Sequence, residues 1–537
     1  MINAPQLLKD LQRQLKHLED DLREHVGAVA GIDAGLREQH QAAREAQRTG
    51  DAYEVWRDAF LTQAAVAWIL GCVFVRFLED NALIDSPLLS GPGERRRLAL
   101  DRHELYFRHP DRRAHSDRDY LLHCFDQVRA HPAAAELFDP RHNPLWAVGP
   151  SGDGATRLLG FWQRLEPDTG ALAHDFTDPE WGTRFLGDLY QDLSEAARNR
   201  YALLQTPEFV EEFILDRTLT PAIGEFGFQE VRLIDPTCGS GHFLLGAFRR
   251  LFELWVAHEP GTNPRALAQR ALDQVFGVDL NPYAVAIARF RLLIAALKAS
   301  GVHSIRREEA PAFHVNVAAG DSLIHGRRFD QLDLGSGADQ LAGRAGIGHA
   351  FLAEDLEALN RILGQRYHAV VGNPPYITVK DKALNQLYRD RYRTCHRQYS
   401  LWVPFTERFF QLAVENIHHE GTKDTKGIDG GAGSGAGFVG MITANSFMKR
   451  EFGKKLIEEF FPRVDLTHVI DTSGAYIPGH GTPTVILFGR DRSPVGETVR
   501  TVMGIKGSRP PRRTRHGAWC GAPSSPNWTG PGARASG

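Results

Sequence analysis

Four consecutive residues form a set that could do chemistry on a planar base: Asn373, Pro374, Pro375 and Tyr376. They follow an apolar run, Tyr367 to Val371, whose length predicts a buried strand. Two successive prolines cannot continue a strand, so the chain leaves the sheet at Asn373. An amide, main-chain carbonyls and a ring then stand at the carboxyl end of a strand, where α/β sheets bind ligands. They suit a base with an exocyclic amino group; the alternative is a stiff loop with a capping asparagine.

A second candidate site follows the strand predicted at Val231 to Ile234. Its sequence is Asp235-Pro236-Thr237-Cys238-Gly239-Ser240-Gly241-His242-Phe243. Gly239 and Gly241 allow close approach of the backbone to a ligand, and the helix predicted at Leu244 to Trp255 offers free N–H groups. The pattern is not GxGxxG and has no Walker lysine, which disfavours a dinucleotide or a nucleoside triphosphate.

Two further acids end predicted strands. Asp279 ends the strand from Val275, where an acid typically accepts hydrogen bonds from ribose hydroxyls. Asp321 follows the strand His314 to Ala319 and could accept from an adenine amino group. Singly, each acid is equally well explained as a helix N-cap. In this order they indicate a pocket for an adenosine-containing cofactor, and S-adenosylmethionine fits because Asp235 can meet the ammonium of its amino-acid tail.

The elements that position these residues alternate between strand and helix. This alternation predicts a parallel sheet with helices on both faces, the α/β class. Thr206 is expected to cap a helix that runs towards Leu219, with Pro207 at its first position. Further predicted strands and helices are Phe438 to Thr443, Thr467 to Asp471, Thr484 to Phe488, Tyr283 to Lys298, Leu352 to Leu363, Trp402 to Ile417 and Phe452 to Phe460. The sheet is expected to end near Arg490.

The first 195 residues are expected to be an α-helical domain. Leucines spaced three and four apart (Leu8, Leu11, Leu15, Leu18, Leu22) predict a bundle helix, and Trp56 to Asn81 predicts an apolar helix at the centre. Residues 196–495 are then the catalytic domain. Residues 496–537 form a tail without periodicity that is expected to be disordered or aberrant. Polar, glycine-containing loops are expected at Arg327 to Gly348, 420–437 and Tyr476 to Thr482.

Composition is that of a globular protein of several domains. The 537 residues are 42% hydrophobic and 24% charged, and the net charge is -3, so any nucleic-acid surface must be local. Five cysteines without CxxC spacing argue against a disulfide framework and against a zinc site, and favour the cytoplasm. The apolar run Ala64 to Val75 is too short to span a bilayer, so no membrane association is expected.

The combined motifs resemble a known family. Asp235 to Phe243 together with Asn373 to Tyr376 is similar to the amino-group DNA methyltransferases, in particular the N6-adenine branch with gamma-type motif order. The match covers roughly residues 200 to 490. AVAWILGCVFVRFLEDNALID and IDTSGAYIPGHGTPTVILFGR further resemble the adenine methyltransferases of bacteriophage-exclusion (phage growth limitation) systems.

The resemblance implies a Rossmann-like S-adenosylmethionine-dependent sheet preceded by a helical domain. It implies methyl transfer to N6 of a flipped adenine in double-stranded DNA, with other defence-system proteins as candidate partners. Asn373 and the Pro374 carbonyl would accept the amino hydrogens, with Pro375 stiffening the turn and Tyr376 stacking on the base. The implied cofactor-binding residues are Thr206, Asp235, Thr237, Gly239, Gly241, Phe243, Asp279, Asp321 and Asn373. Cys238 is not a nucleophile in this interpretation, and His242 and His480 are not needed as bases.

Several alternatives remain open. Family members of this size usually carry a separate target-recognition domain, and the tail does not resemble one, so a truncated reading frame is our expectation. The chain would then be an inactive or partner-dependent fragment that binds cofactor only. Glutamine in a protein, or RNA, are the alternative substrates. Residues 1 to 195 show no convincing nuclease pattern, which disfavours a fused restriction enzyme.

Overall fold

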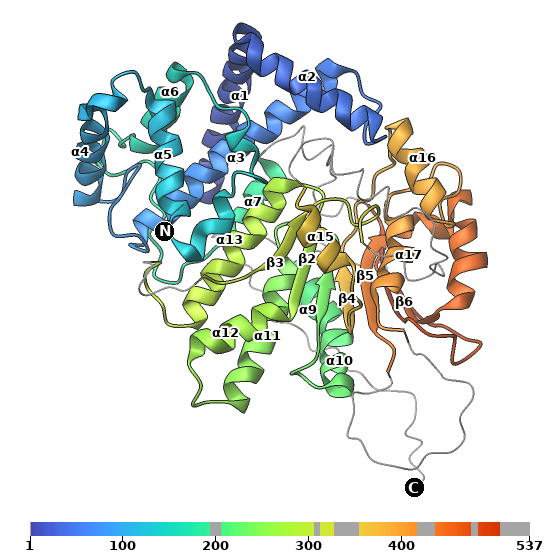
Figure 1. Cartoon of the computed structure of the whole chain (residues 1–537). Coiled ribbons are helices and arrows are strands. Elements are labelled where there is room, and N and C mark those ends of the chain that lie inside the picture. Colours follow the sequence, from blue (N-terminus) through green and yellow to red (C-terminus); the bar gives the residue numbers. More distant parts are fainter. Residues whose placement is uncertain are drawn as a thin grey trace.

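The computed structural model describes residues 2–193, 206–305, 312–326, 354–415, 435–473 and 482–504. In these residues an eight-stranded sheet has helices on both faces, and a group of helices from the first part of the chain lies beside it (Figure 1). The predicted α/β class is therefore confirmed. The predicted insertion Arg327 to Gly348, most of the loops at 420–437 and Tyr476 to Thr482, and the tail from residue 505 onward lie outside the described residues. Residues 496–504 of the predicted tail are described, and the expectation of disorder is wrong there because they include a strand of the sheet, Arg500–Met503.

The first part of the chain is helical, as predicted. Its helices are α1 (Ala4–Ala28), α2 (Ala30–Glu45), α3 (Tyr53–Asp80), α4 (Glu94–Arg108), α5 (Asp117–Arg129), α6 (Gly152–Gln163) and α7 (Phe185–Asp192), with short 3-10 turns η1 (Pro110–Arg112), η2 (Pro132–Phe138) and η3 (Pro144–Trp146). Helix α1 packs on α3, and four of the five predicted leucines (Leu11, Leu15, Leu18 and Leu22) are buried, whereas Leu8 is half-buried. It thus has the role of a bundle helix.

Helix α3 is the centre of this helical part. Among the described helices, α3 alone is long and apolar enough to cross a membrane. Its apolar stretch is, however, completely buried inside the protein. At its end, Arg76 donates to both carboxylate oxygens of Asp80, at 3.0 and 2.8 Å, and lies 3.5 Å from a carboxylate oxygen of Glu79. These charged groups are buried, so they are paired with one another, as charges in a core must be.

The sheet has the strand order β3-β2-β1-β4-β5-β7-β6-β8. Strands β1 to β5 are parallel, β7 is antiparallel to both β5 and β6, and β8 is parallel to β6. Their bounds are β1 (Leu233–Asp235), β2 (Val275–Asp279), β3 (Asn316–Ala319), β4 (Ala369–Gly372), β5 (Phe438–Ala444), β6 (Asp465–Asp471), β7 (Thr484–Arg490) and β8 (Arg500–Met503). The chain direction places the carboxyl ends of β1 to β4 along one edge.

Alternate strand residues enter two different cores, because successive side chains of a strand point to opposite faces. Leu233 packs in the core that contains α9 (Glu208–Arg217), α11 (His242–His258) and α13 (Pro282–Ala299), whereas Ile234 packs in the core of the other face. The remaining helices are α10 (Leu219–Phe226), α12 (Pro264–Asp273), α15 (Leu356–Leu363), α16 (Lys382–Arg391) and α17 (Trp402–Leu412). Both faces of the parallel strands β1 to β5 are covered, as the apolar runs of these strands require.

Three predictions about the last part of the chain are wrong. The sheet does not end near Arg490, because β8 pairs with β6 beyond it. Helix α17 ends at Leu412 rather than Ile417, since Ala413 pairs with Tyr367 as an isolated bridge. In place of one helix from Phe452 to Phe460 there are short 3-10 turns, η4 (Asn445–Met448), η5 (Glu451–Gly453) and η7 (Phe461–Arg463), and a π-helical turn, η6 (Leu456–Phe460).

Candidate functional site

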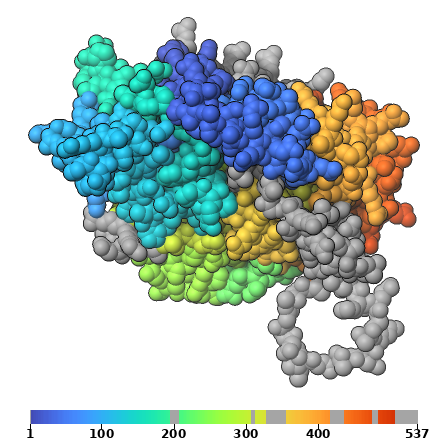
Figure 2. Space-filling model, turned by 45° about the horizontal axis from the view of Figure 1, so that its top comes forward, coloured from blue at the N-terminus to red at the C-terminus, as the bar shows by residue number. Residues whose placement is uncertain are grey.

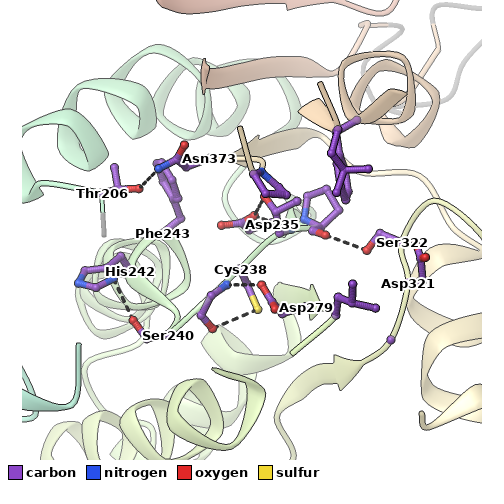
Figure 3. Close-up of a pocket in the computed structure, with 18 of the residues that line it drawn as sticks. Thr206, Asp235, Cys238, Ser240, His242, Phe243, Asp279, Asp321, Ser322 and Asn373 are labelled. Atoms are coloured by element: carbon purple, nitrogen blue, oxygen red, sulfur yellow. Dashed lines mark hydrogen bonds between the residues drawn. The ribbon is translucent and has the colours of Figure 1, made fainter. Parts of the chain in front are cut away.

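A cleft of about 890 Å³, measured with its open mouth, lies at the carboxyl edge of the parallel strands. Strand order reverses between β1 and β4, with β2 and β3 on one side and β5 on the other. In an open α/β sheet such a point is where ligands bind. The predicted residues that line the cleft are Thr206, Asp235, Thr237, Gly239, Phe243, Asp279, Asp321, Asn373 and Pro375 (Figure 3).

Asp235 ends β1 and is almost completely buried. Its Oδ1 accepts hydrogen bonds from the N–H (2.9 Å) and the hydroxyl (3.1 Å) of Thr237. No described residue donates to its other oxygen. Burial, reinforced by the nearby charge of Asp279, raises the pKa of Asp235 to about 8. A buried carboxyl with a raised pKa at the edge of a cleft is suited to meet a cationic ligand group.

The glycine loop between β1 and α11 depends on two left-handed residues. Gly239 has φ +52° and Gly241 has φ +83°, conformations that glycine adopts without strain. Gly241 is also the N-cap of α11, so the first N–H groups of that helix begin at the cleft. A Cβ on Gly241 would lie 3.0 Å from the Cβ of Ala288. The loop therefore packs closely on α13 while its backbone faces the cleft.

Asp279 ends β2, and its carboxylate is hydrogen-bonded to the glycine loop. Its Oδ2 accepts the Gly239 N–H at 2.9 Å, and its Oδ1 accepts the Asn281 N–H at 2.8 Å. Burial raises the pKa of Asp279 to about 6. The N-cap of the following helix is Asn281 and not Asp279. The capping alternative for Asp279 is thus wrong, and its carboxylate is left to line the cleft.

Asp321 follows β3 and is buried. Its Oδ1 accepts the Leu323 N–H at 2.9 Å, and its Oδ2 accepts the hydroxyl of Tyr388 at 2.6 Å. Next to it, the Ser322 hydroxyl donates to the Pro236 carbonyl at 2.7 Å, which ties this loop to the glycine loop. Asp321 is therefore held firmly in place, and any ligand donor would share an oxygen with a protein donor.

The tetrapeptide leaves β4 as predicted. The Asn373 amide nitrogen donates to the Thr206 hydroxyl at 3.2 Å, and its Oδ1 accepts the hydroxyl of Tyr376 at 2.6 Å. Before it, a Cβ on Gly372 would lie 2.6 Å from Oδ1 of Asp235. The absence of a side chain at Gly372 thus lets β4 and β1 bring Asn373 and Asp235 to the same cleft.

Thr206 is not the N-cap that the sequence predicts. Pro207 is the N-cap residue, and α9 begins at Glu208. The Thr206 hydroxyl instead accepts from Asn373. Of the other predicted residues, Gly241, Pro374 and Tyr376 are not part of the cleft lining. Pro374 is buried and Tyr376 is half-buried beside Asn373.

Several lining residues were missed by sequence reasoning. Tyr190, on α7 of the helical part, reaches the glycine loop, and a Cβ on Gly239 would lie 3.1 Å from its hydroxyl. Tyr388 and Ser322 hold Asp321 and its loop. Nothing local marks any of these residues as functional, because each acts through a partner far away in the chain. Four further lining residues lie in the predicted glycine-loop stretch, where no role was assigned to them: Pro236, Cys238, Ser240 and His242. The other missed lining residues are Leu280, Gly320, Ile377, Leu401 and Phe405.

His242 faces the cleft, but it is not suited to be a base. Its ring nitrogen Nδ1 lies 3.3 Å from the Ser240 hydroxyl. Burial, together with the charge of Arg291, lowers the pKa of His242 to about 3. The ring therefore stays neutral and binds a proton weakly at neutral pH, in agreement with a reaction that needs no strong base.

Comparisons with known proteins agree with this geometry. Residues 273–418 match the family Eco57I restriction-modification methylase. The chain is 51% identical over 94% of its length to the adenine-specific methyltransferase PglX of Streptomyces coelicolor, and spans 42% of that relative's length. It is 25% identical over 52% of its length to the type II methyltransferase M.PaeR7I of Pseudomonas aeruginosa, covering 39% of that protein.

A solved structure supports the fold. The DrdV–DNA complex superposes on 93% of this chain and 43% of its own, with a TM-score of 0.51 and 15% identity.

Proposed function

This chain is a relative of the adenine-specific methyltransferases, and from that premise we propose that it transfers a methyl group from S-adenosylmethionine to N6 of adenine in DNA. The observation that carries the proposal is the meeting of Asn373, on the turn after β4, with three carboxyl groups from other strand ends in one cleft. We propose further that it is the modification enzyme of a phage-defence or restriction-modification system and acts in the cytoplasm on double-stranded DNA.

The cleft fits the cofactor chemically. Asp235 offers an oxygen that no described residue occupies, beside the free N–H groups at the start of α11, and these suit the ammonium and carboxylate of an amino-acid tail. Asp279 suits ribose hydroxyls, and Asp321 with the apolar Leu280 and Phe405 suits an adenine ring. When bound, S-adenosylmethionine supplies an electrophilic methyl group on its sulfonium.

Asn373 prepares the amino group of the target base. The N6 lone pair of adenine is delocalised into the ring and is therefore a poor nucleophile. Hydrogen bonds from the two amino hydrogens to Asn373 Oδ1 and the Pro374 carbonyl draw the nitrogen towards tetrahedral geometry and stabilise the positive charge that develops on it. Thr206 orients the amide, because it accepts from the amide nitrogen and so turns Oδ1 away from itself.

Tyr376 is hydrogen-bonded to Asn373 Oδ1, the oxygen that would accept the amino group of the base. Its hydroxyl donates to Asn373 Oδ1 at 2.6 Å. Entry of an adenine that has left the duplex replaces this hydrogen bond by one from the amino group, and the phenol ring is then free to stack on the base. The hydroxyl thus donates to the same oxygen that the amino group of the base would use.

The test is methyl incorporation from labelled S-adenosylmethionine into unmethylated duplex DNA, with RNA and protein offered in parallel. We expect N6-methyladenine in DNA, and its loss in Asn373→Ala. The matched control is Asn360→Ala, an exposed asparagine on α15. Incorporation into RNA or protein glutamine alone would contradict the proposal. Cofactor binding without any incorporation would favour the alternative of a fragment that binds cofactor only.

A further inference from the structure

A short segment between α2 and α3 reaches across to the catalytic sheet. The guanidinium of Arg48 donates to Glu354 Oε1 at 2.6 Å. Both side chains are withdrawn from solvent, with 8% of Arg48 and 1% of Glu354 exposed. In Figure 2 the dark blue N-terminal helices lie directly against the orange segment that contains α16. A buried ion pair thus joins the helical part to the loop region after β3.

Glu354 in turn holds the backbone of Asp321. The same Oε1 that binds Arg48 accepts the Asp321 N–H at 3.2 Å. The other oxygen, Oε2, lies 3.0 Å from the ring nitrogen Nε2 of His325, which is on the same loop. Arg48 therefore acts on Asp321 through one intermediate side chain.

A second connection from the same segment reaches Asp321 by another route. The Gly50 N–H and the Thr49 hydroxyl donate to Asp381 Oδ2 at 2.6 and 3.2 Å. Asp381 is the N-cap of α16. That helix carries Tyr388, whose hydroxyl donates to Asp321 Oδ2 at 2.6 Å. The first route ends on the backbone N–H of Asp321 and the second on its carboxyl group, which lines the cleft after β3.

The charges explain why a cation is needed at Arg48. Asp321 and Glu354 are both buried, and the N–H of one contacts the carboxylate of the other. Burial of Arg48 opposes its positive charge, but the charges of Glu354 and Asp321 outweigh burial and raise the pKa of Arg48 above its ordinary value. Arg48 therefore pairs with these carboxylates as a cation, and neither Arg48 nor Glu354 is part of the cleft lining.

We propose that Arg48 is a positioning residue for the cofactor site: through Glu354 it holds Asp321 in the place that the adenosine part of the cofactor requires. The inference rests on the proposed function and extends it to the helical part of the chain. The helical part of the chain then contributes to the cofactor site in addition to packing against the sheet.

The experiment measures cofactor affinity of the full chain by calorimetry. Ligands are S-adenosylmethionine and its demethylated product, which share the adenosine part. For Arg48→Gln we expect dissociation constants about tenfold higher for both ligands. KM for the cofactor should rise while kcat at saturating cofactor stays close to that of the parent protein. Arg48→Lys should recover part of the affinity, and Arg44→Gln, an exposed arginine on α2, should change nothing.

The outcomes separate this inference from the proposed function. If the parent protein binds neither ligand, the proposed function fails. If it binds them and Arg48→Gln binds equally well, with only a lower melting temperature, then Arg48 is merely structural and the inference is overturned.

A second variant guards against misfolding of Arg48→Gln. Glu354→Gln keeps the shape of the side chain and removes its charge, and it should weaken binding as well. The double variant should be no weaker than the worse single variant, because both act through one path. If the affinity losses of the two single variants add up in the double variant, Arg48 and Glu354 act independently, which contradicts the proposed path.

Discussion

At the scale of single residues, the amide of Asn373 is held by hydrogen bonds at both of its ends. Thr206 fixes its nitrogen, and Tyr376 saturates its oxygen. A polar group with both ends satisfied has one orientation, which a catalytic amide needs. In the proposed reaction, the target amino group must therefore compete with the Tyr376 hydroxyl for the Asn373 oxygen.

This competition can be measured with Tyr376→Phe. The variant keeps the ring for stacking and removes the competing hydroxyl, so we expect kcat/KM for DNA to be equal to or above that of the parent protein. Tyr376→Ala loses stacking as well, and we expect a decrease of about 10- to 100-fold. A loss in Tyr376→Phe as large as that in Tyr376→Ala would show that the hydroxyl itself acts in the reaction. Steady-state methylation of a duplex with one target site gives both values.

Sequence reasoning found the groups that depend on local pattern. Asp235 and Asp279 end apolar runs that form strands because such runs must be buried, and the glycines between strand and helix mark a close approach. Partners that are distant in the chain could not be found in this way. Arg48 and Glu354 are 306 residues apart, and Tyr388 and Asp321 are 67 apart. Thr206 was given the wrong partner, since a capping pattern does not show that another side chain competes for the hydroxyl.

At the scale of elements, strands β1 and β4 bring Asp235 and Asn373 to one cleft because β4 can approach β1 closely at Gly372. In Gly372→Ala the new methyl group would lie 2.6 Å from Asp235 Oδ1 and 2.7 Å from the Thr237 hydroxyl. We expect a loss of about 1–3 kcal/mol in the free energy of unfolding and cofactor affinity below detection. Gly224→Ala is the matched control, because nothing lies within 4 Å of its Cβ, and a helical position such as this gains up to about 1 kcal/mol. Urea titration and calorimetry distinguish the two variants.

Helix α3 carries buried carboxylates that are stable only because a buried cation pairs with them. Arg76→Met would leave Glu79 and Asp80 in the core without a cation, and burial already raises the pKa of Glu79 to about 7. We expect the free energy of unfolding to fall by about 3–5 kcal/mol. Arg37→Met removes an exposed i,i+4 pair with Asp33 and should leave the free energy of unfolding close to that of the parent protein. Equal effects in denaturant titrations would contradict the assignment.

Three features of the fold were not predicted from the sequence, and each has a physical reason. Strand β8 is exposed along its whole length, so it lacks the apolar pattern by which strands are found. The reversed direction of β7 is decided by its neighbours and not by its own residues, which are apolar on both faces. The turns from Asn445 to Arg463 pack aromatic side chains without a helical period, and Trp402 meets Phe447 and Phe452 there.

At the scale of the whole molecule, the helical part and the sheet share one hydrophobic core. Phe74 of α3 stacks on Phe290 of α13 at 4.4 Å between ring centroids, and Phe77 meets the same ring edge-on at 5.4 Å. One continuous set of buried side chains runs from Leu7 to Phe488. Where the domain boundary near residue 195 lies stays a prediction, but in this core the two parts depend on each other.

A shared core predicts joint unfolding. We expect one thermal transition for the full chain, reported equally by far-ultraviolet circular dichroism and by tryptophan fluorescence. Ligand that binds the cleft should raise the melting temperature seen by both probes together. Two transitions, only one of which responds to ligand, would show that the helical part folds independently.

The raised pKa values in the cleft mean that cofactor binding is also an acid–base event for the molecule. With a pKa of about 8, Asp235 is largely protonated at pH 7 in the empty protein. A cationic ligand beside it favours the carboxylate, so a proton is expelled into solution as the ligand enters. Affinity should therefore rise from pH 6 to about 7.5, above which an α-amino group itself loses its proton. At pH 7 the binding heat should depend on the ionisation enthalpy of the buffer, with close to one proton released; a heat that is the same in phosphate and in Tris would mean that Asp235 enters the complex already charged.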